Sequence, residues 1–317
     1  FFFFFFFFFF FFFFFFLSYV RLQSPQLVIL GGKDNQGKIS STVFTLRVGK
    51  NLDTDGIPEP VLARDGAAVA VAGLDLLVVA GGRLQDGTVT TSVEMFDGVA
   101  WSMQSAMPAA RVDAAAVGLR DGRVVVLGGF DPEGQRTDSV LVYYAHGNEW
   151  RVSTPMKAAR GGHCAALVGD TSIAVVGGAQ SRLDVELLDS LTLAQQRTLS
   201  PWRTADVLGC AAFNGKLMIA VNTLERGFEL VDTTEGSVAT AYILAADSIR
   251  QQWGGSARPL AMQYVRGHLL AVSQHQVHVA LPDHEAHTYQ SGHQTAWPTI
   301  ATVPPDLRAL TKTSECF

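Results

Sequence analysis

The 317-residue sequence predicts an all-β fold, a ring of repeated four-stranded antiparallel sheets, and three observations favour it. A glycine doublet follows an apolar run four times, at intervals of 50, 47 and 49 residues. The phrases around the doublets recur in phase, and no stretch has the pattern of a helix of useful length. A repeat of about 50 residues is typical of a β-propeller or another repeat array. The doublets are Gly31-Gly32, Gly81-Gly82, Gly128-Gly129 and Gly177-Gly178.

The stretch 111–150 contains one complete unit. An apolar run over 112–119 ends at a turn with Asp121-Gly122, and a second run over 124–127 stops at its glycine doublet. A polar loop then leads to the apolar strand 140–144 and to a short last strand that carries Trp150. Short β-branched and aromatic runs between turn residues predict strands, and Asp-Gly between two of them predicts a hairpin. The inner runs are continuously apolar because a sheet packed on both faces buries both sides of its strands.

Further units are expected on either side of this one. Residues 27–48 supply the second and third strands of a first unit, and 49–60 is a connection rich in Pro, Gly and Asp. The second unit covers about 64–101 and the fourth about 160–202. After residue 203 the strand rhythm continues through two more units, in which Ala220-Val221 and Ala271-Val272 stand at the glycine positions.

The C-terminal stretch repeats the phrase between the interior units, with Trp297, Pro304-Pro305, Arg308 and then a strand. It has no second strand of its own. We expect the segment after Pro305 to pair beside residues 27–48 and to complete the first sheet. Ring closure of this kind removes unpaired sheet edges, so a closed six-bladed ring, with four antiparallel strands per blade, is favoured over an open array.

The repeat resembles that of the kelch family of β-propellers, a motif also found in the central domain of galactose oxidase. The family repeat runs Arg, a strand, a strand ending in Gly-Gly, a strand with Tyr, and a Trp. Here these marks are Arg111, Gly128-Gly129, Tyr143-Tyr144 and Trp150. They recur as Arg64, Gly81-Gly82, Phe96 and Trp101, and the resemblance covers about residues 27–178.

Composition restricts the kind of partner. The net charge of -5 and the pI near 5.9 argue against a nucleic-acid surface or an anionic-membrane surface. The cysteines, Cys164, Cys210 and Cys316, are odd in number and widely spaced, with no CxxC pattern. Neither a disulfide framework nor a zinc site is therefore indicated, and we expect reduced, mostly buried thiols.

Motifs for catalysis are missing from the sequence. It contains no GxSxG, HExxH or GxxxxGK[ST] pattern. Six histidines gather near the C-terminus, but the spacing of His275 and His278 on a strand puts them on opposite faces, and His284 and His287 are expected in a polar loop. We therefore expect no metal site, no cofactor and no enzymatic activity.

The first 16 residues are all Phe, and with the next four they are long enough to cross a bilayer. No basic region precedes them, and a natural apolar segment is seldom a homopolymer. We interpret residues 1–22 as a low-complexity segment and 23–317 as one propeller domain. A cytoplasmic location is expected, with secretion or membrane anchoring as the alternative if the Phe run is genuine.

Equivalent positions in a ring converge on one opening, which we call the mouth. The starts of the first strands and the loops after the doublets lie at the same end of a four-stranded sheet. In kelch proteins that bind peptides, the matching arginine faces the partner pocket, so the resemblance implies a cationic mouth suited to carboxylates. The alternative role of these arginines is a salt bridge from one blade to the next, or a hydrogen bond to loop carbonyls. The expected partner-binding residues are Arg64, Arg111, Arg160 and Arg258, with the loop residues Lys33, Arg83, Phe130, Asp131 and Gln180.

Two functions remain open. The first is a non-catalytic interaction module that binds a peptide or protein segment at the mouth, where the arginines favour an acidic segment. The second is a propeller enzyme acting on an acidic sugar, similar to a mutarotase, at the same mouth.

Overall fold

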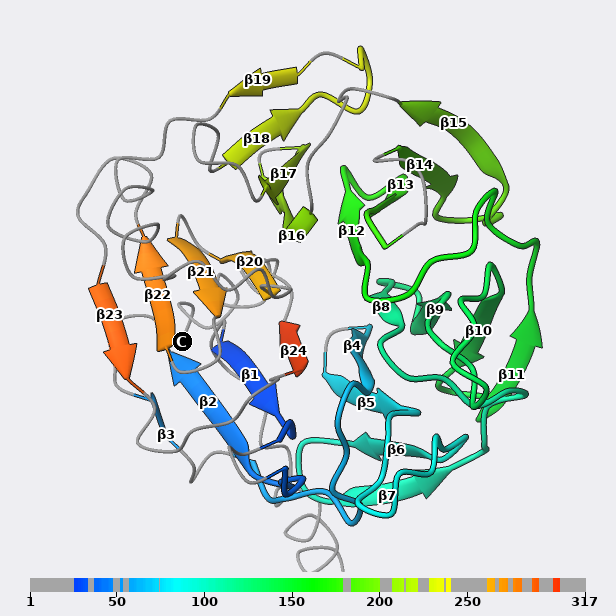
Figure 1. Ribbon diagram of the computed structural model, residues 1–317, viewed down its shortest axis with the longest axis vertical. Coiled ribbons are helices and arrows are strands. Elements are labelled where there is room, and N and C mark those ends of the chain that lie inside the picture. The colour runs from blue at the N-terminus through cyan, green and yellow to red at the C-terminus, as the bar shows by residue number, and fades with distance from the viewer. Residues whose placement is uncertain are drawn as a thin grey trace, which may run out of the picture.

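The computed structural model describes residues 26–33, 37–47, 52–53, 57–73, 75–178, 184–199, 207–213, 215–221, 228–236, 238–240, 261–265, 268–272, 276–280, 287–290 and 299–302. These residues form strands, turns and loops without a helix, which confirms the all-β prediction. They contain six four-stranded antiparallel sheets, arranged about a common centre (Figure 1). We number the sheets 1 to 6 in chain order. No helix among the described residues is long and apolar enough to cross a membrane.

Sheets 2 and 3 lie where the sequence predicts them. Their strands pair in chain order, each antiparallel to the next. Sheet 2 contains β4 (Ala68–Ala72), β5 (Leu76–Ala80), β6 (Val93–Phe96) and β7 (Trp101–Gln104). Sheet 3 contains β8 (Ala115–Gly118), β9 (Arg123–Leu127), β10 (Val140–Tyr144) and β11 (Glu149–Val152).

Sheets 4 to 6 follow the same plan. Sheet 4 contains β12 (Cys164–Val168), β13 (Ser172–Val176), β14 (Val185–Asp189) and β15 (Gln195–Leu199). Sheet 5 contains β16 (Val207–Phe213), β17 (Lys216–Val221), β18 (Phe228–Val231) and β19 (Val238–Thr240). Sheet 6 contains β20 (Ala261–Val265), β21 (His268–Val272), β22 (Gln276–Ala280) and β23 (His287–Gln290). The prediction that His287 lies in a loop is wrong, because it pairs with Val279 in the sheet.

Sheet 1 draws its strands from both ends of the chain. It contains β1 (Gln26–Leu30), β2 (Val43–Arg47), β3 (Leu52–Asp53) and β24 (Thr299–Thr302). The short β3 lies within the segment interpreted as a connection, and it pairs with β2. The strand beside β1 is β24, and the prediction that the segment after Pro305 takes this place is wrong. A β-branched run precedes Pro304, and proline cannot donate to a ladder, which favours a strand that ends before it.

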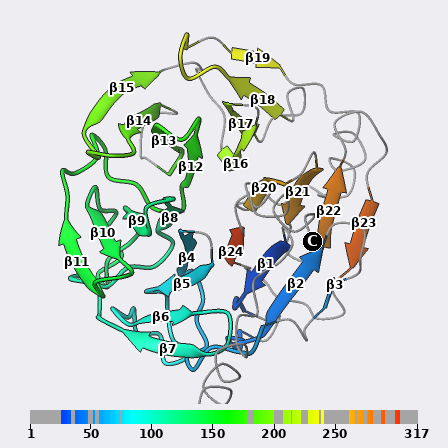
Figure 2. The ribbon, with the colours of Figure 1, turned by 180° about the vertical axis from the view of Figure 1, so that it is seen from behind.

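The cores lie between neighbouring sheets. In the views from both sides, the first strands β4, β8, β12, β16, β20 and β24 lie nearest the centre (Figures 1 and 2). One cluster joins sheets 2 and 3 and includes Val78, Val126 and Tyr143. Similar clusters join sheets 1 and 2, sheets 3 and 4, and sheets 4 and 5. Trp150 in the outer strand β11 packs at the edge of the core between sheets 2 and 3. Its ring centroid lies 4.9 Å from that of Tyr143, and its Nε1 donates to the Ser105 carbonyl at 2.8 Å.

The glycine doublets lie where the next sheet approaches most closely. The second glycine donates its N–H to the carbonyl of the following sheet's arginine, as from Gly82 to Arg111 at 2.7 Å and from Gly129 to Arg160 at 2.8 Å. A Cβ built on Gly128, the first residue of its doublet, would stand 2.5 Å from the Arg160 oxygen, and its φ is +56°. Only glycine fits both demands.

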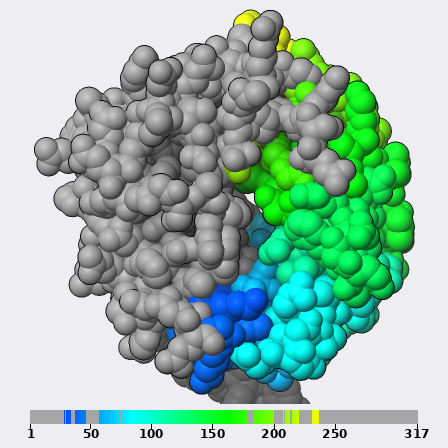
Figure 3. Space-filling model, viewed as in Figure 1, coloured from blue at the N-terminus to red at the C-terminus, as the bar shows by residue number. Residues whose placement is uncertain are grey.

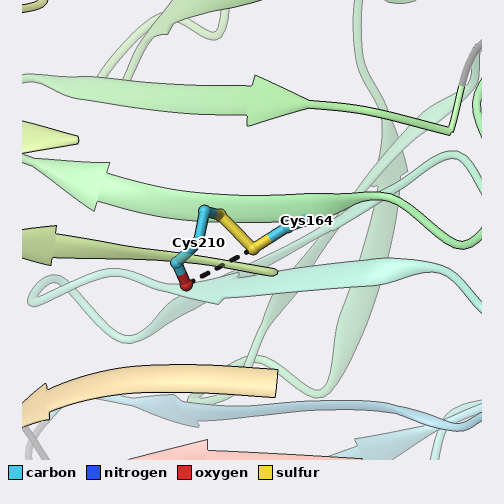
Figure 4. Close-up of a disulfide and its surroundings, with 2 residues drawn as sticks. All are labelled: Cys164 and Cys210. Carbon is cyan, nitrogen blue, oxygen red and sulfur yellow. Dashed lines mark hydrogen bonds between the residues drawn. A yellow bond between two sulfur atoms is a disulfide. The ribbon is translucent and has the colours of Figure 1, made fainter. Parts of the chain in front are cut away.

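Two of the cysteines are joined. Cys164 in β12 and Cys210 in β16 form a disulfide, with an S–S distance of 2.05 Å and a Cα–Cα distance of 5.8 Å (Figure 4). The prediction of reduced thiols is therefore wrong for this pair. The two residues are 46 positions apart, close to one repeat, so the fold places them side by side on the first strands of neighbouring sheets. Cys316 lies outside the described residues.

Candidate functional site: the mouth

Two sheets show the arrangement from which the sequence analysis predicts the mouth. Backbone bridges join the start of a first strand to the residue after its own sheet's doublet, Asp65 to Arg83 and Val112 to Phe130. Asp65 donates to the Arg83 carbonyl at 3.0 Å and accepts from the Arg83 N–H at 2.8 Å. First-strand starts and post-doublet loops therefore share one end of sheet 2 and one end of sheet 3. In the space-filling view, sheets 2 to 4 form a continuous curved band (Figure 3).

Two of the predicted arginines are buried inside their sheets. Arg64 is 1% exposed and binds the carboxylate of Glu94 with an N–O distance of 2.7 Å, while its Nη1 donates to two backbone carbonyls. Arg160 is also 1% exposed and binds Glu186 at 2.8 Å. Neither guanidinium faces solvent, so these two arginines do not form an exposed cationic mouth. Both donate to backbone carbonyls, as the alternative role expects, but each ion pair lies within one sheet and does not join two blades.

The two glutamates were not among the predicted site residues. Each glutamate is the second residue of the third strand in its sheet. Besides its own arginine, each also binds the backbone N–H of the residue three positions before that arginine. Glu94 Oε2 accepts from Val61 at 2.6 Å, and Glu186 Oε2 accepts from Lys157 at 2.7 Å. The recurrence of Glu at the same place in two units was the available sequence signal.

Arg111 has a different environment. The position of the missing glutamate is occupied by Leu141, and Pro108, three residues before the arginine, has no N–H to offer. Arg111 is half-buried, and it donates to the Ala110 carbonyl at 2.7 Å and to Ser139 Oγ at 3.0 Å. Its Nε is buried without a partner. Burial lowers the pKa of Arg111, and the charge of Asp131 opposes this shift. Arg111 therefore lacks the carboxylate that its two equivalents have.

Of the predicted loop residues that the structure describes, only Asp131 acts on the charge of Arg111, and the others make contacts elsewhere. Lys33 forms a salt bridge to Asp65 at 2.9 Å, and Arg83 donates to the Gly87 carbonyl at 3.1 Å. Phe130 packs over the backbone of Gly161 in sheet 4 and lies under the guanidinium of Arg136, 5.4 Å away. Asp131 Oδ1 accepts from the Gln135 N–H at 2.7 Å. Gln180 and Arg258 lie outside the described residues.

A chain of backbone hydrogen bonds crosses the sheets at the mouth. Asp113 donates its N–H to the Gly66 carbonyl at 2.8 Å, and Gly162 donates to the Asp113 carbonyl at 2.9 Å. The three residues occupy equivalent positions, two after the arginine, and all have positive φ: 63°, 53° and 64° for Gly66, Asp113 and Gly162. Asp113 therefore places a carboxylate where the neighbouring sheets have glycine. Aspartate tolerates this backbone region better than most residues, but at some cost in strain.

The carboxylate of Asp113 lies in a charged environment. Its accessible area is that of an exposed residue, but nearby protein atoms displace part of the hydration of its carboxylate. This desolvation, followed by repulsion from the charge of Asp65, raises the pKa of Asp113 to about 6. The charges of Arg83 and Lys33 act in the opposite direction. Asp65 and Asp113 were missed at the sequence level, because nothing in a single unit indicates that they meet.

His163 follows Gly162 and lies between sheets 3 and 4. Its two ring nitrogens are buried without a hydrogen-bond partner, and its ring fills the space beside Gly128. Desolvation, with the charge of Arg160 adding to it, lowers the pKa of His163 to about 3. The residue is therefore a neutral packing group at physiological pH.

Replacing Asp113 by Asn should change how stability depends on pH. The folded-state pKa of Asp113 lies above its ordinary value of 3.8, so its contribution to stability is full below about pH 4 and is lost as the pH rises through 6. Asp113→Asn should therefore melt at a higher temperature than the wild type at pH 7, and the difference should shrink by pH 4. The pH dependence of stability that comes from His163 has the opposite sign, because its contribution to stability is lost as the pH falls from 6.5 toward 3.

Thermal melts at pH 4, 5.5 and 7 test this expectation. Asp131→Asn, which removes one negative charge from the same end of sheet 3, is the control for the loss of charge alone. An Asp113→Asn melting difference that is equal at all three pH values would contradict the raised pKa.

No group of three or more His, Cys, Asp or Glu side chains in the described part of the chain is placed to hold a metal ion. A protein-family model, described as the Kelch motif, matches residues 113–157. The match covers the four strands of sheet 3 and confirms the resemblance that the sequence suggests. No curated protein matches the chain.

Proposed function

Because the chain carries a kelch repeat, we propose that it is an interaction module whose mouth binds an acidic peptide or protein segment, with Arg111 as the anchor for a carboxylate. A kelch repeat is in keeping with a protein-interaction module in general. The acidic character of the partner and the role of Arg111 rest on the geometry of sheet 3.

The proposal includes a closed six-bladed ring. Pairing of β24 with β1, in the register Ile300 to Ile29, supports closure between the two ends of the chain. The contacts of β24 with both β4 and β20 are in keeping with it. A closed ring would hold the loops of successive sheets in fixed positions around one mouth, which is what a recognition surface requires.

The single observation that carries the proposal is the contrast between Arg111 and its equivalents. Arg64 and Arg160 are neutralised within their own sheets, whereas Arg111 has Leu141 at the glutamate position. Its guanidinium is half-buried and lies beside the hydroxyl of Ser139. A carboxylate from outside would complete the same set of interactions. Charge-assisted hydrogen bonds of this kind are stronger than neutral ones.

Replacing Arg111 by Ala should weaken the binding of such a partner. A ligand can be obtained by selection from a random peptide library against the folded protein, and its affinity measured by fluorescence polarisation. A charge-assisted contact contributes about 1.5–3 kcal/mol. Arg111→Ala should therefore weaken binding by about ten- to a hundredfold. Selected peptides should contain Asp or Glu, and replacing that residue by its amide should cause a similar loss.

The matched control is Arg151→Ala, which removes an exposed arginine from the outer strand of the same sheet. Its affinity should equal that of the wild type. Circular dichroism shows whether each variant remains folded. Peptides without carboxylates, or an unchanged affinity in folded Arg111→Ala, would show that the carboxylate anchor lies elsewhere.

The second candidate is an enzyme acting on an acidic sugar at the same mouth. Asp113 is the observation in its favour, since a carboxyl group with a pKa of about 6 can exchange a proton near neutral pH. Nuclear magnetic resonance of anomer exchange in acidic sugars, with wild type and Asp113→Asn, separates the two functions. A rate that depends on Asp113 would favour the enzyme.

A further inference from the structure

We infer that this protein folds and works in an oxidising compartment, where the Cys164–Cys210 disulfide is a permanent link between sheets 4 and 5. The inference does not depend on what the mouth binds. It replaces the cytoplasmic location expected from the sequence.

The position of the disulfide supports a structural role. Cys164 begins β12, and Cys210 lies within β16, the first strand of the next sheet (Figure 4). These two strands are neighbours at the centre of the ribbon, but they belong to different sheets, so no backbone ladder joins them. The sulfur bridge is therefore a covalent connection across a boundary that is otherwise held by apolar packing, including Val168 and Ile219.

The surroundings argue against a transient or catalytic disulfide. Cys210 is 3% exposed, and Cys164 is only partly exposed. Redox-active cysteines are accessible and lie close in sequence, often as CxxC, whereas this pair is 46 residues apart. Zinc ligation is also unsupported, because no third ligand joins the two cysteines among the described residues. A buried, long-range bridge is what a secreted or exported protein uses for stability.

Formation of the bridge needs an oxidant. Two thiols of the folding chain exchange with a disulfide of low molecular mass, such as oxidised glutathione, and two molecules of reduced thiol leave. The cytosol keeps thiols reduced, whereas the compartments outside it allow this exchange to run to completion. A stable bridge in the native protein is therefore a property of the compartment as well as of the fold.

The redox state in the native source gives the direct test. Cells are lysed in acid and alkylated with N-ethylmaleimide, and the protein is digested without reduction and mapped by mass spectrometry. The expected result is a cross-linked peptide pair containing Cys164 and Cys210, with little alkylation at either residue. Alkylation of both cysteines in the freshly lysed source would overturn the inference.

Reduction of the purified protein gives the second test. Adding reductant should lower the melting temperature by about 5–10 °C, because the bridge closes a loop of about 46 residues in the unfolded chain. The double variant Cys164→Ala/Cys210→Ala should melt at the reduced temperature and should not respond to reductant. Cys316→Ala, the control, should respond as the wild type does. A wild-type melting temperature that reductant leaves unchanged would show that the bridge is absent or does not hold the two sheets together.

Discussion

Replacing Glu186 by Leu is expected to lower the free energy of unfolding by about 3–5 kcal/mol, because it leaves the buried charge of Arg160 without a carboxylate. Arg160 Nε and Nη2 both donate to Glu186 Oε1, at 3.1 and 2.8 Å, and both side chains are 1% exposed. The same change also removes the acceptor for the Lys157 N–H. Urea denaturation followed by circular dichroism measures the effect.

Two further variants identify the cause. Arg160→Met combined with Glu186→Leu should recover at least half of the loss, because no unpaired charge then remains in the core. Arg111→Ala should cost much less than Glu186→Leu, since its guanidinium is half-buried and has no glutamate. If the double variant is less stable than Glu186→Leu, the pair contributes through its packing and hydrogen bonds, and the explanation from an unpaired charge is wrong.

Replacing Gly118 by Ala is expected to have the second large effect. Gly118 ends β8, and a Cβ at this position would overlap the backbone carbonyl of Val71 in β4. The two strands are also joined nearby, because Gly73 donates its N–H to the Leu119 carbonyl at 3.0 Å. A backbone oxygen cannot rotate away as a side chain can, so sheets 2 and 3 must separate. We expect a loss of about 3 kcal/mol or more, at the upper end of the usual cost of overpacking.

Gly147→Ala is the control for this prediction. Gly147 belongs to the same sheet and has no positive φ, and an added Cβ would meet its nearest neighbour at 3.4 Å, an ordinary contact. Its stability should change by less than about 0.5 kcal/mol. Equal effects at Gly118 and Gly147 in thermal or urea unfolding would contradict the close approach of the two first strands.

The repeat itself could be predicted from the sequence because the first four units carry the same marks in phase. The glycine doublets, the Asp-Gly turn and the aromatic residues identify where strands begin and end, and all three reflect local backbone demands. The strand predicted at 140–144 coincides with β10. The short β3 could not be found in this way, because its residues Leu52 and Asp53 have no β-branched or aromatic character, and pairing with β2 alone makes them a strand.

The roles of the arginines could be predicted only in part. Their equivalence in the repeat is visible in the sequence, but whether each one is buried depends on a residue about 30 positions further on. Arg64 and Arg160 have that partner, and Arg111 does not. To find the partner in the sequence, the units must be aligned strand by strand and not by a fixed spacing. The loop before β14 is shorter than the loops before β6 and β10, so a fixed spacing from the arginine misses Glu186.

The disulfide and the Asp65–Asp113 pair were missed for a shared physical reason. Both join residues of different units, so no pattern within one unit reveals them. The separation of 46 residues between Cys164 and Cys210 was the one usable sign, because a distance near one repeat places residues on neighbouring first strands.

The bonds that join the sheets at the mouth are made largely by the backbone. They run from Gly162 to Asp113, from Asp113 to Gly66, and from the second glycine of the first three doublets to the next arginine's carbonyl. None of them uses a side-chain atom. Related proteins can therefore exchange exposed mouth residues in the course of evolution with little effect on how the sheets assemble, provided that the glycines stay. New binding specificities can therefore arise from side-chain changes at the mouth while the backbone bonds between the sheets stay the same.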